Sequence, residues 1–270
     1  MKSSPINNIL LTCLCILYAA PIVWLATISL KYEVDIFSMP PKWLFMPTLI
    51  HYRNVLADSA VTTFLTNSLI IAAGATLLAL LVGTLAAYGC AHWRSTLAEG
   101  FLFSLFVLRI LPGVAVVVPI YLVASKLSLV DNYLTLILVH VCVMLPIAVL
   151  MLQNFILEVP RELEEAAIVD GCSRFGAFIR IVLPLISPGL VATAVLSLIM
   201  SWNEFLFTMT LSGSNTQTLP VGVTFFMADK VINWGEIAAM GIIMIIPVAL
   251  FTFMVQKYLI KGLTMGAIKE

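Results

Sequence analysis

Long apolar runs recur along this chain and decide what it can fold into. They cover residues 9–30, 64–90, 101–124, 133–157, 185–208 and 236–260. At a helical rise of about 1.5 Å per residue, each run is long enough to cross a hydrocarbon core about 30 Å thick. With 61% hydrophobic and 10% charged residues, and a mean hydropathy of +1.09, the chain has more apolar surface than a soluble core absorbs. The pattern predicts an all-α polytopic membrane protein, with six transmembrane helices in one domain over residues 1–270.

The charge balance and the cysteines exclude several classes of function. The 14 bases equal the 14 acids and form no basic block, so nothing in the sequence attracts a nucleic acid. The five cysteines are scattered and match neither a metal site nor a disulfide framework. The sequence has no HExxH motif, no GxSxG motif and no G-x-x-x-x-G-K-[ST] phosphate loop. We predict that the chain is not an enzyme, holds no metal or cofactor, and leaves any ATP chemistry to another chain.

The distribution of basic residues predicts which side of the membrane each loop faces. The first apolar run continues past Ala19, Ala20 and Pro21 to Leu30, so we expect a retained helix rather than a cleaved signal peptide. Six crossings put both termini on one side. The bases of that side are Lys2, Arg94, Arg161, Arg174, Arg180, Lys257, Lys261 and Lys269, against Lys31, Lys42, Arg53, Lys126 and Lys230 opposite. Because lysine and arginine favour the cytoplasm, we place both termini and residues 158–184 there.

The longest charged interruption that still looks folded is residues 158–184, here called the 158–184 segment. Pro160 suits the first turn of a helix, and Gly171 suits its end. One face of this helix would carry Leu163, Ala166, Ala167 and Asp170. Ser173 can cap a second short helix whose apolar stripe is Phe175, Phe178, Ile179 and Val182. The pattern fits either a rigid projection hinged at Gly171 or an amphipathic loop lying on the lipid headgroups.

The same segment carries a specific sequence motif. Glu165-Ala166-Ala167, three residues, Gly171, nine residues and then Ile181-Val182-Leu183-Pro184 match the pattern EAA---G---------I-LP. In this respect the chain resembles the permease subunits of bacterial ATP-binding-cassette importers. Residues 67–94, 109–138, 201–207, 218–226 and 261–270 also look like the carbohydrate-uptake branch, in particular the shorter permease of maltose-type systems. Cys90 and Met265 are small departures from that pattern.

The resemblance implies a type I importer fold in which this chain forms half of the pore. It also implies a second homologous permease, two ATP-binding subunits that hold ATP and Mg²⁺, and an extracytoplasmic solute-binding protein, all at the bacterial inner membrane. The residues that would couple to an ATPase subunit are Glu165, Ala166, Ala167, Asp170 and Gly171. Among these, Glu165 suits a charge-assisted contact and Gly171 the turn. The cargo would be a sugar or sugar-like solute, with a polyol or glycerol phosphate as the alternative.

Four polar or aromatic residues within the apolar runs are weaker candidates for a substrate pathway. They are Arg109, Trp202, Asn203 and Glu204. A charged group such as Arg109 is costly in hydrocarbon, so it either lines the pathway or pairs with carbonyls or with an acid of a partner subunit. We expect His140 to be a hydrogen-bonded packing residue. The polar loop from Leu211 to Trp234 should face outward, where it either contacts the binding protein or is uninvolved.

A self-sufficient secondary transporter is the main competing class. Such a protein needs its own coupling-ion site and is usually built from repeated halves. The sequence shows no internal repeat and few acids within the apolar runs. The importer permease is therefore the stronger interpretation.

Overall fold

The computed structural model describes residues 5–93, 95–228 and 232–265, and within these ranges the chain is helical without any strand. The helices are α1 (Pro5–Ser29), α2 (Glu33–Ile36), α3 (Ile50–Ala57), α4 (Ser59–His92), α5 (Thr96–Ile110), α6 (Gly113–Lys126), α7 (Tyr133–Leu157), α8 (Arg161–Val169), α9 (Arg174–Ala177), the π-helix η1 (Phe178–Val182), α10 (Leu183–Leu185), α11 (Ser187–Trp202), α12 (Leu206–Leu211), α13 (Leu219–Ala228) and α14 (Trp234–Met265). The chain divides into two compact units, Met1–Leu65 with Leu219–Pro247 and Thr66–Thr218 with Val248–Glu270. Each unit is described by itself.

Four of the six expected crossings are single helices. The spans Asn7–Ser29, Ser59–His92, Tyr133–Leu157 and Trp234–Phe253 are long and apolar enough to cross a membrane. The pairs Thr96–Ile110 with Gly113–Lys126, and Arg174–Leu185 with Ser187–Trp202, meet this test only together, with bends of 100° and 75°. The described residues therefore hold four spans, or up to six if each bent pair counts as one.

Two apolar stretches and one polar loop differ from their sequence-based description. In the helix expected at 101–124, Pro112 and Gly113 predict a kink or local loosening, and the structure has a full break there between α5 and α6, because Pro112 cannot continue the hydrogen-bond ladder of α5. Arg109 consequently lies in the last turn of α5. The expected helix at 185–208 is divided into α11 and α12, since Asn203 ends the first and Glu204 caps the second. The loop expected over 211–234 contains α13; residues 229–231 lie outside the described residues.

The second unit is built on close packing between α4 and α7. Small residues recur at every fourth position of α4, where helical geometry places them on one stripe: Ala75, Ala79, Gly83, Ala87 and Ala91. The four alanines are buried. A Cβ added at Gly83 would lie 3.3 Å from the Cβ of Ala148 on α7. Small residues of this kind let helix backbones approach closely within a membrane.

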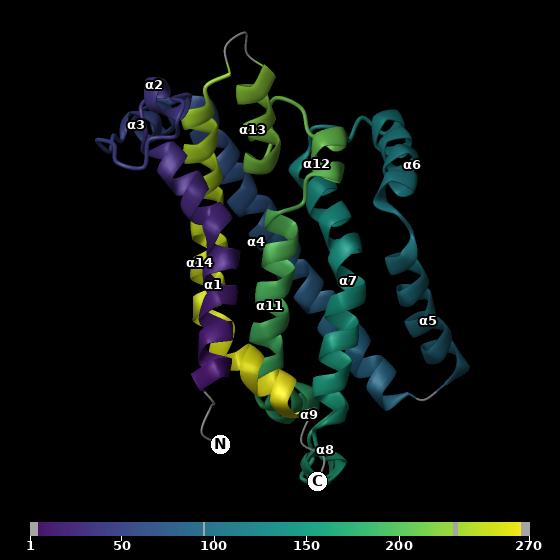
Figure 1. The fold of residues 1–270 in the computed structure, drawn as a ribbon. Coiled ribbons are helices and arrows are strands. Elements are labelled where there is room, and N and C mark those ends of the chain that lie inside the picture. The colour runs from purple at the N-terminus through teal and green to yellow at the C-terminus, as the bar shows by residue number, and fades with distance from the viewer. Residues whose placement is uncertain (1–4, 94, 229–231, 266–270) are drawn as a thin grey trace. The chain divides into compact units, whose positions relative to one another are not determined.

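Within this unit, two apolar clusters lie at opposite ends of α7. One contains Leu152, Phe178 and Val182, beside the 158–184 segment. The other contains Val117, Leu136 and Phe207, from α6, α7 and α12. Figure 1 shows α8 and α9 at one end of α7 and α11, and α6 and α12 at the other end. The 158–184 segment and the residues around α12 therefore lie at opposite ends of this unit.

The first unit joins the N-terminal helices to α13 and to the start of α14. His51 of α3 shares a hydrogen bond of 2.8 Å with the carbonyl of Lys31. Its ring also lies where a Cβ on Gly235 would be, so the ring packs against the backbone there only because residue 235 is glycine. Asn54 donates to Glu236 over 2.9 Å. Residues 31–63, which lie between the first two apolar runs, thus include α2, α3 and the start of α4.

Candidate functional site

The 158–184 segment is folded as two consecutive helical parts. Pro160 precedes α8, and Glu162 and Glu164 stand in its first turn, where carboxylates suit the positive end of the helix dipole. α8 ends at Val169. The second part runs from α9 through the π-helix η1 into α10. This confirms that the segment contains two short helices.

Gly171 forms the turn between these parts. Its φ angle of +92° lies in the left-handed region that favours glycine. The amide of Cys172 donates to the carbonyl of Ala167 over 2.9 Å, and the amide of Gly171 donates to the carbonyl of Ile168 over 3.0 Å. These two bonds are the Schellman motif that closes helix C-termini. The turn expected at Gly171 is confirmed.

Ser173 caps the second part as expected. Its hydroxyl oxygen accepts a hydrogen bond of 3.1 Å from the amide of Gly176. The expected apolar stripe is divided, because Phe178 and Val182 are buried whereas Phe175 and Ile179 are exposed. The π-helix at Phe178–Val182 has i→i+5 hydrogen bonds, and this wider turn changes the α-helical spacing on which the stripe was predicted.

The residues predicted to share one face of α8 differ in their burial. Glu164 and Ala167 are buried, while Glu165, Ala166 and Asp170 are exposed. Ala166 and Ala167 therefore do not share an outward surface. Among the candidate coupling residues of this segment, a separate protein can directly reach those that are exposed.

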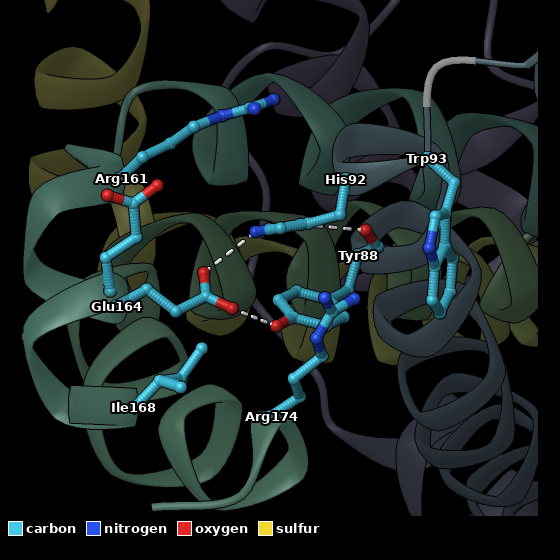
Figure 2. Close-up of a pocket in the computed structure, with 8 residues that line it drawn as sticks. Tyr88, His92, Trp93, Arg161, Glu164, Ile168 and Arg174 are labelled. Carbon is cyan, nitrogen blue, oxygen red and sulfur yellow. Dashed lines mark hydrogen bonds and ion pairs between the residues drawn. The ribbon is translucent and has the colours of Figure 1, made fainter. Parts of the chain in front are cut away.

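Glu164 makes the main polar contact between α8 and α4. Its side chain accepts a hydrogen bond at Oε1 from the hydroxyl of Tyr88, and its Oε2 lies 2.8 Å from Nε2 of His92. Only 7% of Glu164 is exposed. Nδ1 of His92 lies 3.1 Å from the carbonyl of Tyr88. Figure 2 shows Tyr88 and His92 meeting the two carboxylate oxygens of Glu164.

Aromatic and cationic groups surround this contact. The ring of Tyr88 lies 4.2 Å from that of His92 and 4.6 Å from that of Phe178, measured between centroids. Arg161 donates to the carbonyl of Ala91 over 3.3 Å. A cavity of about 390 Å³ opens beside the cluster, and its lining includes Trp93, Arg161, Glu165 and Arg174. Figure 2 shows the two arginines on either side of Glu164.

The four candidate pathway residues do not form a single open site in this chain. Arg109 lines a cavity of about 330 Å³ near the α5–α6 break, together with Pro146 and Phe207. Trp202 is only 2% exposed and presents no aromatic face to the outside of this chain. Asn203 is exposed and donates to the carbonyl of Ile199 over 2.8 Å.

Glu204 has a structural role in the break between α11 and α12. Its carboxylate accepts from the amides of Phe207 and Thr208 over 3.0 and 2.9 Å. His140 lies 2.7 Å from the hydroxyl of Ser201, 3.1 Å from that of Thr208 and 3.5 Å from Glu204. The prediction that His140 is a hydrogen-bonded packing residue is confirmed. A substrate role for the four pathway candidates stays a prediction.

A further polar cluster, which sequence reasoning missed, lies at the other end of the second unit. The carboxylate of Asp131 accepts hydrogen bonds from the amides of Gly213, Asn215 and Thr216 and from the side chains of Asn215 and Thr216. Burial would raise the pKa of Asp131, but these bonds, led by that from Thr216, outweigh burial and lower the pKa. Asn67 donates to the carbonyls of Asn215 and Gln217. Together these contacts fix the loop 212–217.

The fold and the 158–184 segment together define a polytopic helical membrane protein with a structured polar projection between two apolar stretches. A family model described as "Binding-protein-dependent transport system inner membrane component" matches residues 79–265. The chain belongs to this family, which comprises permease subunits of ABC importers.

Curated relatives align over nearly the whole chain. The probable ABC transporter permease protein y4oR of Sinorhizobium fredii is 37% identical, over 95% of this chain and 92% of its own. The trehalose/maltose transport system permease protein of Thermococcus litoralis is 33% identical, over 98% of this chain and 95% of its own. The sulfoquinovosyl glycerol transport system permease protein of Agrobacterium fabrum is 33% identical, over 92% of this chain and 88% of its own.

Solved structures agree at the level of the fold. A chain from a bacterial ABC transporter involved in the import of the acidic polysaccharide alginate aligns with a TM-score of 0.80. The alignment covers 94% of this chain and 95% of that chain, at 20% sequence identity. The family and fold implied by the EAA pattern are therefore confirmed. The coupling roles of Glu165, Ala166, Ala167, Asp170 and Gly171 stay predictions.

Proposed function

We propose that this chain forms half of the pore of a binding-protein-dependent importer for a sugar or sugar-like solute. The observation that carries the proposal is the 158–184 segment, an ordered two-helix projection that holds the EAA pattern and turns at Gly171. The cargo class is supported by relatives named for trehalose/maltose and for sulfoquinovosyl glycerol. The complete transporter would contain a second homologous permease, two ATP-binding subunits and an extracytoplasmic binding protein.

In this proposal the chain carries out no ATP chemistry of its own. ATP and Mg²⁺ bind to the partner subunits, and the chain responds to their closure. Glu165 and Asp170 are exposed on α8, so their carboxylates can meet basic groups of an ATP-binding subunit. Gly171 sets the direction of the projection. Closure of the partners would switch the permeases between inward-facing and outward-facing arrangements.

The orientation follows from the charge distribution and belongs to the proposal. Both termini and the 158–184 segment face the cytoplasm of a bacterial cell, and the chain lies in its inner membrane. The loop 212–217 then faces outward, within the 211–234 stretch proposed to contact the binding protein. Of the C-terminal stretch 261–270, which looks like the carbohydrate-uptake branch, residues 266–270 lie outside the described residues.

Purification of the assembled complex tests this function. An affinity tag on this chain should retain a second permease and an ATP-binding subunit, and the complex should hydrolyse MgATP faster when the binding protein is added. Mass spectrometry of ligand released from the binding protein should reveal a glycoside. Solute uptake by this chain alone, in vesicles without an ATP-binding subunit, would contradict the proposal.

Substitution of Gly171 tests the coupling role directly. Gly171→Asp puts a side chain at a φ of +92°, where L-residues are strained, and adds charge to the proposed docking surface. We expect normal membrane insertion but loss of uptake by about tenfold or more, a range typical of broken coupling. Glu99→Gln, which changes the charge at an exposed position on α5 outside the segment, is the control. Wild-type uptake by the Gly171→Asp variant would remove the coupling role from this segment.

A further inference from the structure

The contact between α8 and α4 joins the 158–184 segment to a helix that is distant in sequence. Along the chain, the segment is continuous with α7 at its start and with α11 at its end. α4 has no such covalent connection to it, since Glu164 lies 76 residues from Tyr88 and 72 from His92. Any movement of α8 that is transmitted directly to the end of α4 must therefore pass through side-chain contacts.

Glu164 makes these contacts in a way that fixes direction as well as distance. Tyr88 and His92 are four residues apart, so they lie on one face of α4. Each of them meets a different oxygen of the Glu164 carboxylate. Two bonds from one rigid helix face resist both sliding and rotation of α8 against α4. The bond from Arg161 to the carbonyl of Ala91 adds a separate point of attachment.

The chemistry of this contact is unusual for simple packing. A buried carboxylate is costly unless its oxygens are paired, and an apolar side chain of similar size often gives equal or greater stability. Here the carboxylate is buried and both of its oxygens are satisfied. His92 is itself oriented, because its other ring nitrogen lies 3.1 Å from the carbonyl of Tyr88. The arrangement favours directional attachment over stability.

We propose that Glu164 is a positioning residue of energy coupling, and that the Tyr88–Glu164–His92 cluster transmits movement of α8 to the end of α4. The inference rests on the proposed docking of the 158–184 segment against an ATP-binding subunit. In this proposal the neighbouring residues Glu164 and Glu165 have different roles. Glu165 is exposed toward the partner, whereas Glu164 points inward and links the projection to a membrane-spanning helix.

The test uses the complete complex in lipid nanodiscs, with MgATP as the probe. The measurement is the ratio of ATP hydrolysis with the copurified binding protein to hydrolysis without it. His92→Gln replaces a ring that is held against Tyr88 by a flexible side chain, whereas His92→Arg supplies N–H donors that can reach a carboxylate. We expect the ratio to fall by about tenfold in His92→Gln, within the range of typical coupling effects, and to return to at least half of the wild-type value in His92→Arg. Equal ratios for these two variants and the wild type would overturn the proposal.

An apolar variant separates transmission from folding. Replacing Tyr88 by Phe, His92 by Leu and Glu164 by Leu removes every polar partner together, so no buried charge is left unpaired. We expect this complex to assemble and to keep its basal hydrolysis while losing stimulation by the binding protein. Retained stimulation in an assembled apolar variant would overturn the proposal. Failed assembly together with equal ratios for His92→Gln and His92→Arg would assign the cluster a purely structural role and overturn it as well.

Gly171→Asp distinguishes failure of this inference from failure of the proposed function. If Gly171→Asp uncouples the complex but the cluster variants do not, the segment still couples and only the role of Glu164 is refuted. If Gly171→Asp also leaves stimulation intact, the docking role of the whole segment is refuted. Glu99→Gln again controls for the loss of a carboxylate elsewhere.

Discussion

At the level of single residues, one carboxylate holds the loop 212–217 of the second unit in place. Asp131 accepts five hydrogen bonds from residues of the loop 212–217, and the distances range from 2.7 to 3.2 Å. Three of the donors are backbone amides. The backbone path of the loop therefore depends on a residue more than 80 positions away.

Asp131→Asn should release this loop. An amide offers one acceptor oxygen in place of two, so some donors of Gly213, Asn215 and Thr216 are left unpaired. Hydrogen bonds to charged groups contribute about 1.5–3 kcal/mol each, so we expect amide exchange at 213–217 to accelerate by at least about tenfold. Hydrogen–deuterium exchange with mass spectrometry measures this. Unchanged exchange in this loop would show that Asp131 does not hold it.

The same carboxylate predicts how the loop responds to pH. The pKa of Asp131 is lower in the folded protein than its ordinary value of about 3.9. A lowered pKa means that the contribution to stability is full above the ordinary pKa and is lost as pH falls through the folded pKa. Protection of 213–217, corrected for intrinsic exchange, should thus stay constant from pH 7 to about pH 5. A loss of protection in that interval would contradict the assigned state of Asp131.

At the level of elements, the packing of α4 on α7 depends on its stripe of small residues. Ala79 is fully buried in this stripe, and Ala79→Leu would force extra volume between the helices. Overpacking of this kind costs about 1–3 kcal/mol, so we expect a lower thermal midpoint for the purified complex. Leu81→Ala is the control on the same helix, because Leu81 is 62% exposed. An unchanged midpoint for Ala79→Leu would show that α4 and α7 can move apart at this position without loss of stability.

The breaks within the apolar stretches show where sequence reasoning succeeded and where it could not. Pro112 and Gly113 predicted a local loosening, and the α5–α6 bend confirms it. The size of that bend depends on packing of α6 against α12, which hydropathy does not report. Glu204 looked like a candidate ligand because its neighbours are polar and aromatic. Its role as the cap of α12 becomes visible only when the backbone amides of Phe207 and Thr208 are placed.

The 158–184 segment was the most predictable part of the chain, for local reasons. Helix ends at Pro160 and Gly171 and the cap at Ser173 depend on residues within a few positions of one another, which sequence displays directly. The bond between Glu164 and His92 depends on two segments brought together by the fold. Only the helical spacing of Tyr88 and His92, two polar rings at the end of an apolar run, hinted at a shared partner.

At the level of the whole molecule, the proposed orientation places the two polar ends of the second unit in different compartments. Leu97, at the start of α5, is 84% exposed and should face the cytoplasm. Ser214 is exposed in the loop 212–217 and should face outward. In a cysteine-free background, a membrane-impermeant maleimide should label Ser214→Cys in cells with a permeabilised outer membrane, and Leu97→Cys only after lysis. The reverse pattern would invert the topology and remove the 158–184 segment from reach of ATP-binding subunits.

α4 carries its packing stripe and its two contacts to Glu164 on one uninterrupted helix, so the two share a single register. One residue inserted between Gly83 and Ala87 would rotate everything after it by about 100°. Ala87 and Ala91 would then no longer face α7, and the same insertion would turn Tyr88 and His92 away from Glu164. Within this helix, changes of length are therefore far more restricted than changes of side chain, and natural variation in α4 should occur by substitution and not by insertion or deletion.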